Sequence, residues 1–355
     1  MGFTYEFAIV AGEDGPSVVS SRAHPEPIVP ILNASHDRMH PVEGESAWSE
    51  SYYFNGYDPD ADVGIYTRIG IRPNEGTMDV MLACWQPNNQ IAFVRAKREQ
   101  KEMCESPLEV GGVRYDCREE GKRWHLTADA EARLYHLKTR EHRKIPFSLD
   151  LEFESLIPMI GVDGQGTPQT SASASASTSQ STGKGHLEQA GRWSGWIEAD
   201  GIRQTLGARA RGNRDKSWGP RRWGGPKMWR WFSINISDDI HFGGIRIGTD
   251  AGDLHRGWVW RDGEHTSLVE WRVRTETRED DITQKTCFVT AVDKKGREHE
   301  LRADVMRVFP GGARPGETVV NEGLAKWTYE GQTGYGIAEY LHQFDDEGRP
   351  LVPIE

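Results

Sequence analysis

The chain has 355 residues, more than one hydrophobic core usually serves, so two domains are expected. Its hydrophobic content of 36% supports packed cores, while the net charge of −11 argues against nucleic acid or an anionic membrane surface as the main partner. The first residues lack the basic and apolar regions of a signal peptide, and no apolar run approaches the roughly 20 residues that span a bilayer. The four scattered cysteines include no Cys-x-x-Cys pair and indicate free thiols, so we expect a cytoplasmic protein without an integral membrane segment.

Alternation of apolar and polar residues predicts strands in the first half. Residues 64–72 alternate with period two and stop at a Pro-Asn-Glu-Gly turn, after which residues 77–85 predict a second strand. Residues 126–137 fit both a helical and a strand periodicity. Near the start, Glu50 and Tyr52 share one strand face, and a carboxylate on an apolar face is either paired or functional.

A change of composition divides the chain. Residues 163–185 are rich in Ser, Ala, Gly and Thr, which cannot bury enough apolar surface to offset the entropy of ordering. We therefore expect an N-terminal β-barrel domain over residues 1–162, a flexible linker or loop over 163–185, and a C-terminal Trp-rich β-barrel domain over 186–355. One domain with a disordered surface loop is the alternative.

The second half also reads as short strands. Residues 287–292 and 300–308 flank a Gly-containing turn and predict a hairpin, and repeated short strands of this kind indicate antiparallel barrels or sandwiches. Ten of the 13 tryptophans follow residue 185. Core filling explains any one of them, but pairs such as Trp229 and Trp231, with both rings on one strand face, also suit an aromatic-lined pocket.

The segment 212–221 carries the clearest chemical signal. Asp215 lies there among Arg214, Lys216 and Trp218. Apolar rings desolvate a carboxyl group and raise its pKa, which allows proton donation near neutral pH, whereas neighbouring arginines favour its ionised form. An Arg–Asp clamp that closes a barrel end would use the same residues without catalysis, and this alternative stays open.

Two later segments place titratable groups beside glycines. His241 precedes Phe-Gly-Gly, and Glu339 shares a strand face with Ile337 and Leu341. The histidines at 36 and 40 hint only weakly at a metal, because no helix aligns them, so no metal site is predicted. The chain lacks a phosphate-binding Gly-rich loop and a Gly-x-Ser-x-Gly elbow, which argues against nucleotide chemistry and acyl transfer by serine.

The motifs around Asp215, His241 and Glu339 resemble those of a poorly characterised bacterial family that is remotely similar to carotenoid 1,2-hydratase and AttH-like proteins. Those are tandem lipocalin-like (calycin) barrels with an Asp-x-x-Trp-Gly motif early in the second half, matched here from Asp215 to Gly219. Their Glu-aromatic-aromatic motif early in the first half corresponds to the segment after Glu50. Position 216 is often His in the closer family and is Lys here.

The resemblance implies a cofactor-independent hydratase or dehydratase, isomerase or cyclase that acts on a hydrophobic isoprenoid-, steroid- or polyketide-like molecule. An acid in a Trp-rich pocket suits such chemistry, because aromatic faces stabilise a cation. The expected catalytic residues are Asp215, Glu50, Glu339 and His241. The expected substrate-binding residues are Tyr52, Trp196, Trp218, Arg221, Trp229, Trp231 and Tyr335. The alternatives are a carrier for a lipid-like molecule and an accessory protein with filled barrels, and an oligomer is compatible with either.

Overall fold

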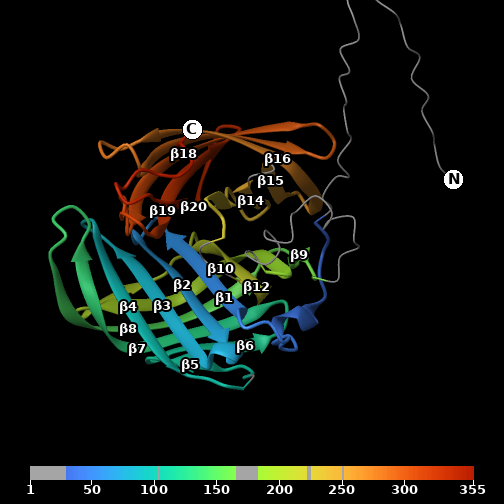
Figure 1. The fold of residues 1–355 in the computed structure, drawn as a ribbon. Helices are drawn as coiled ribbons and strands as arrows, with labels where there is room; N and C mark the ends of the chain where they lie inside the picture. Colours follow the sequence, from blue (N-terminus) through green and yellow to red (C-terminus); the bar gives the residue numbers. More distant parts are fainter. Residues whose placement is uncertain (1–28, 103, 165–182, 222–224, 250–251) are drawn as a thin grey trace, which may run out of the picture.

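The computed structural model describes residues 29–102, 104–164, 183–221, 225–249 and 252–355. Within these ranges the chain forms twenty strands in two antiparallel sheets, which confirms the expected all-β fold of two antiparallel barrels in tandem (Figure 1). Two short 3₁₀ helices, η1 (Ala34–Asp37) and η2 (Pro73–Glu75), accompany the first sheet. Residues 165–182, most of the Ser/Ala-rich segment, lie outside the described ranges.

The first sheet precedes residue 221. Its strands are β1 (Trp48–Asp58), β2 (Val63–Arg72), β3 (Thr77–Gln86), β4 (Gln90–Glu99), β5 (Leu108–Val110), β6 (Val113–Glu119), β7 (Arg123–His136), β8 (His142–Ser155), β9 (Ile160–Val162), β10 (Gly185–Ala199), β11 (Ile202–Thr205) and β12 (Arg211–Pro220). Pairing runs from β1 through β2, β3, β4, β7, β8, β10 and β12 and returns to β1, so these strands close into a ring. The segment 126–137 lies almost wholly in β7 and is therefore a strand.

The second sheet is a closed barrel of eight strands paired in chain order. Its strands are β13 (Met228–Asn235), β14 (Ile240–Thr249), β15 (Gly252–Arg261), β16 (Glu264–Thr277), β17 (Gln284–Asp293), β18 (Glu298–Phe309), β19 (Thr318–Tyr329) and β20 (Gln332–Gln343). The predicted hairpin of residues 287–308 is formed by β17 and β18.

The division between the sheets differs from the expected boundary at residues 163–185. β9 and β10, on either side of that segment, pair with each other through Val162 and His186. β10 and β12 then close the first ring, between β8 and β1, and so remove two exposed strand edges. The first sheet thus continues to Pro220, and the second begins at Met228.

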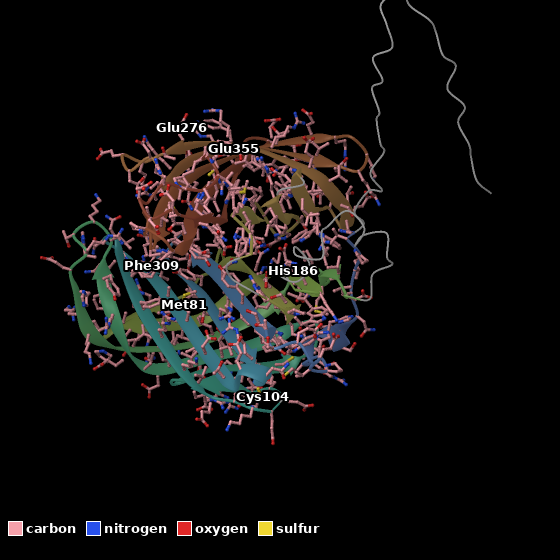
Figure 2. The ribbon with its side chains drawn as sticks, in the orientation of Figure 1. Met81, Cys104, His186, Glu276, Phe309 and Glu355 are labelled. Carbon is pink, nitrogen blue, oxygen red and sulfur yellow. The ribbon has the colours of Figure 1, made fainter. Side chains whose placement is uncertain are left out.

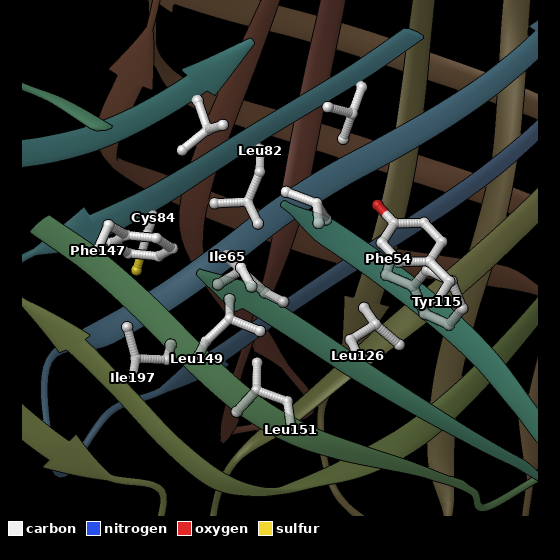
Figure 3. Close-up of a cluster of buried hydrophobic side chains, with 14 of the residues drawn as sticks. Phe54, Ile65, Leu82, Cys84, Tyr115, Leu126, Phe147, Leu149, Leu151 and Ile197 are labelled. Atoms are coloured by element: carbon white, nitrogen blue, oxygen red, sulfur yellow. The ribbon is translucent and has the colours of Figure 1, made fainter. Parts of the chain in front are cut away.

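Apolar side chains fill the interior of both barrels. Inward residues of the first barrel form one cluster, part of which Figure 3 shows around Phe54, Leu126 and Leu149. A second cluster, which includes Trp271 and Trp327, fills the other barrel. A third cluster joins outward-facing residues of both barrels. Strands such as β13 are consequently buried on both faces along their whole length. In the described ranges, no helix has the length and apolarity needed to cross a bilayer.

Candidate active site

A cavity of about 1390 Å³ lies between the two barrels and is lined by residues of both. Figure 2 shows three of its lining residues, Met81, His186 and Phe309, in the zone where the barrels meet. Cys104 lies at the far end of the first barrel in the same view, and Glu276 lies on the outer side of the second. The candidate site is thus formed by the outer faces of strands, whereas the barrel interiors are occupied by core side chains.

Strand register explains why distant residues meet in this cavity. On the first barrel, Glu188, Asp215, Tyr53 and Arg68 lie side by side across β10, β12, β1 and β2. Laterally paired residues point to the same face of a sheet, so all four side chains project toward the second barrel. All four line the cavity.

The second barrel offers a corresponding row. Glu322, Glu339, Trp231, Ile245 and Arg256 lie side by side across β19, β20, β13, β14 and β15. All five line the cavity. The two rows set carboxyl groups of both barrels around one space, with aromatic and aliphatic side chains beside them.

Asp215 pairs with a histidine, not with its neighbouring arginine. Its Oδ2 lies 2.6 Å from Nε2 of His186, and Glu188 lies 3.8 Å from the same nitrogen. Burial alone would lower the pKa of His186, but the two carboxylates raise it. The Arg–Asp clamp considered above is made instead by Arg214, whose guanidinium faces the barrel interior and binds Asp37 at 2.5 Å.

Glu188 is held by two indoles of the opposite barrel. Trp231 and Trp258 each donate an N–H to one carboxylate oxygen, at 2.6 and 2.7 Å. Burial raises the pKa of Glu188, and Asp215 adds to the rise. Gly243 provides the space, since a Cβ there would lie 2.2 Å from Oε2 of Glu188. Gly243 therefore permits a carboxylate of one barrel to enter the wall of the other.

Glu322 and Glu339 form a hydrogen-bonded carboxyl pair. Trp229 donates to Oε1 of Glu339 at 2.6 Å, and the hydroxyl of Tyr53 donates to Oε2 of Glu322 at 3.0 Å. Burial raises the pKa of both carboxyl groups, and the neighbouring carboxylate raises that of Glu322 further. Two adjacent buried carboxyls resist simultaneous ionisation, so the pair retains a proton near neutral pH. Asp215 is close enough for its charge to raise the pKa of both.

Arg221 lies between these groups. Its Nη1 donates to the hydroxyl of Ser217 at 2.9 Å, and its guanidinium carbon lies 5.9 Å from the centroid of Trp229. Burial lowers the pKa of Arg221, and the charges of Asp215 and Glu339 oppose that change. Arg221 therefore supplies positive charge to both barrels' carboxylates at once.

Glu50, Tyr52 and Trp218, which were expected in the site, do not line the cavity and project to the other face of their strands. Glu50 is fully buried and binds Nζ of Lys216 at 2.5 Å. The same ammonium donates to backbone carbonyls of His36 and Arg38. Lys216 thus anchors the η1 segment to the first barrel and does not line the cavity.

His241, Trp196 and Tyr335 also lie outside the cavity lining. His241 is bound to Asn235 and to the backbone carbonyl of Asp238, and burial lowers its pKa to about 4. Trp196 stacks beneath Arg203, at 3.7 Å from its guanidinium carbon. Tyr335 packs on Tyr57 at the edge of the contact between the barrels. Of the expected residues, Asp215, Glu339, Arg221, Trp229 and Trp231 line the cavity.

The chain also offers a metal-ligand set that the sequence did not suggest. Ligand atoms of His186, Glu188 and Asp215 lie within 4.8 Å of one another. The 2.6 Å separation of His186 and Asp215 is a hydrogen-bond distance, so a bound cation would have to displace that proton. The histidines at 36 and 40 offer a poorer site for a metal. His40 binds Glu50 beside the ammonium of Lys216, and the positive charge of that ammonium disfavours a second cation.

Sequence reasoning missed His186, Glu188 and Glu322. Glu322 carries the signal that identified Glu339, since it alternates with apolar Val320 and Leu324. His186 and Glu188 share a strand face directly after the Ser/Ala-rich segment. Too few strand residues precede them there for an alternating pattern to be recognised.

The structure thus defines a tandem β-barrel protein with a carboxyl- and Trp-lined cavity between its barrels. The chain belongs to the family described as a domain of unknown function, DUF7064, which matches residues 33–344. No curated protein matches the chain in sequence.

Two solved structures show the same fold. The crystal structure of CghA has a TM-score of 0.52, and that of CghA with the small molecule Sch210972 has 0.53; each is 10% identical and covers 85% of this chain and 89% of the other. Kievitone hydratase from Nectria haematococca is 11% identical with a TM-score of 0.49, covering 85% of this chain and 93% of its own.

Proposed function

We propose that this protein is a cofactor-independent acid/base enzyme, a hydratase or dehydratase, isomerase or cyclase, that acts on a hydrophobic small molecule between its barrels. The observation that carries the proposal is the proton-bearing Glu322–Glu339 pair, which shares one Trp-lined cavity with the Asp215–His186 pair. Pairs of titratable groups with separated roles are the usual means of acid/base catalysis at neutral pH. A small-molecule ligand in the similarly folded CghA agrees with this use of the fold.

The two pairs have complementary roles. The Glu322–Glu339 pair donates its proton to a substrate alkene or carbonyl, and the indole faces of Trp229 and Trp231 stabilise the resulting cation. Asp215, oriented by His186, then accepts a proton. If that proton leaves a neighbouring carbon, the product is an isomer or a cyclised molecule. If it leaves an attacking water, the product is a hydrate.

The test is turnover in D₂O with a panel of terpenoid, steroid and polyketide compounds, followed by mass spectrometry. Hydration adds the mass of one water, and isomerisation through a protonated intermediate incorporates deuterium. We expect Glu339→Gln and Asp215→Asn to retain ligand binding and to lower turnover by about 100-fold or more, the usual contribution of a general acid or base. Glu300→Gln, which removes an exposed carboxylate of the second barrel, is the matched control.

Retained turnover in both cavity variants would refute the catalytic roles. A carrier for a lipid-like molecule is the second candidate, and it is favoured by the indole clamp on both oxygens of Glu188, which fixes that carboxylate as a structural element. Tight binding of panel compounds by the wild type without any turnover would support that candidate.

A further inference from the structure

Arg256 is a cation of the cavity wall whose side chain has no partner in the described part of the chain. It lies on β15, two residues before Trp258, and its side chain has no ion pair or hydrogen bond among the described residues. Burial lowers the pKa of Arg256, and no carboxylate opposes the change. A guanidinium stays charged under these conditions, so it occupies a partly desolvated position at a free-energy cost that a bound anion would offset.

The composition of the cavity points in the same direction. Its lining contains nine Lys and Arg side chains against six Asp and Glu, although the whole chain carries a net charge of −11. Two of the six acidic residues are Glu322 and Glu339, which hold a shared proton. Arg95 and Lys97, two positions apart on β4, line the cavity and are exposed to solvent, where their positive charge attracts anions.

We propose that the ligand of this cavity is an amphipathic anion, and that Arg256 binds its carboxylate or other planar anionic group. This inference rests on the function proposed above and adds the charge of the ligand. Arg256 shares a lateral row with Ile245, Trp231 and Glu339, and three inter-strand steps separate it from Glu339. At about 4.8 Å a step, the backbone of Arg256 lies about 14 Å along the barrel wall from that of Glu339, so the anionic group binds at the far end of this row from the carboxyl pair.

This geometry defines the rest of the ligand. Its apolar body lies across Ile245 and Trp231, and its reactive carbon lies between Glu339 and Asp215. Arg256 is thereby a positioning and specificity residue, because it touches the ligand far from the reacting atoms. A ligand with an anionic group much closer to its reactive carbon would not reach both points.

Two dyes with the same aromatic skeleton provide the test. Anilinonaphthalene sulfonate is an anion, and phenylnaphthylamine is its neutral counterpart without the sulfonate. We expect the wild-type protein to bind the anion more tightly, with energy transfer from the cavity tryptophans as the readout. Arg256→Met should weaken binding of the sulfonate by about tenfold or more, the usual effect of losing a hydrogen bond to a charged group. Binding of the neutral dye should change less than about twofold.

Arg302→Met removes an exposed arginine of the same barrel, paired with Asp304, and should leave both affinities unchanged. Arg256→Lys should retain part of the preference for the anion. Equal weakening of both dyes by Arg256→Met, or unchanged binding of the sulfonate, would overturn the proposal. The assay needs no turnover, so its outcome is independent of whether the acid/base function survives its own test.

Discussion

Replacement of Glu339 by Gln tests the electrostatic account of the carboxyl pair. The carboxylate is largely buried in the cavity wall, accepts an N–H from Trp229 at 2.6 Å and is hydrogen-bonded to Glu322. Gln has nearly the same shape, and its amide oxygen can accept from the indole while its NH₂ donates to Glu322. The substitution therefore removes a titrating charge with little change in packing.

The expected effect depends on pH in a defined direction. Burial raises the pKa of Glu339 in the folded protein from 4.5 to about 6. Below the lower value both folded and unfolded chains are protonated, and the group does not affect the pH dependence of stability. Between the two values Glu339 is ionised in the unfolded chain but still protonated in the folded protein, so the wild type loses stability as pH rises. At 1.36 kcal/mol per pH unit, the total loss is about 2 kcal/mol and is complete above the folded pKa.

The Gln variant does not undergo this loss. Its free energy of unfolding minus that of the wild type should therefore increase by about 2 kcal/mol from about pH 4 to about pH 8. Urea unfolding monitored by Trp fluorescence measures the difference, provided that the slopes with denaturant agree between the two proteins. Glu300→Gln controls for the loss of an exposed charge. A difference that stays constant with pH, or decreases, would refute a buried carboxyl with a raised pKa.

Two further substitutions test the packing around the site. Gly243→Ala should push Glu188 away from its indole donors and lower the unfolding free energy by about 2–4 kcal/mol. Gly44→Ala, with no atom within 4 Å of the new Cβ, should be neutral in the same urea titration. Lys216→Met should remove the ammonium that neutralises the buried Glu50 and lower the unfolding free energy by about 3–5 kcal/mol. Adding Glu50→Gln should recover much of this loss, and an equally unstable double variant would contradict the pairing.

Local patterns predicted much of this fold and part of its site. Period-two alternation identified β2 and β3, and the same alternation placed Trp229 and Trp231 on one face, where both line the cavity. Glu339 was recognisable as a carboxylate on an apolar strand face. These features depend only on neighbours within one strand, which sequence periodicity records.

Non-local pairing was beyond the reach of such patterns. A Ser/Ala-rich segment has the same composition whether it links two barrels or connects adjacent strands of one, so the contribution of β10 and β12 to the first ring was missed. Glu188 acquires its role only through its register opposite Asp215 and its contact with indoles of the other barrel. Glu50 was also wrongly expected in the cavity. Alternation shows that a strand has two faces, but it does not show which face points into the barrel and which points toward the cavity.

The central claim is that ligands bind between the barrels, not inside either one. A crystal structure of the protein with anilinonaphthalene sulfonate or a turned-over panel compound tests it most directly. For a turned-over compound we expect density between Asp215, Trp231 and Glu339, with its anionic group at Arg256. The shorter anilinonaphthalene sulfonate should lie with its sulfonate at Arg256 and its rings on Ile245 and Trp231. Density confined to a barrel interior or to the outer surface would contradict it.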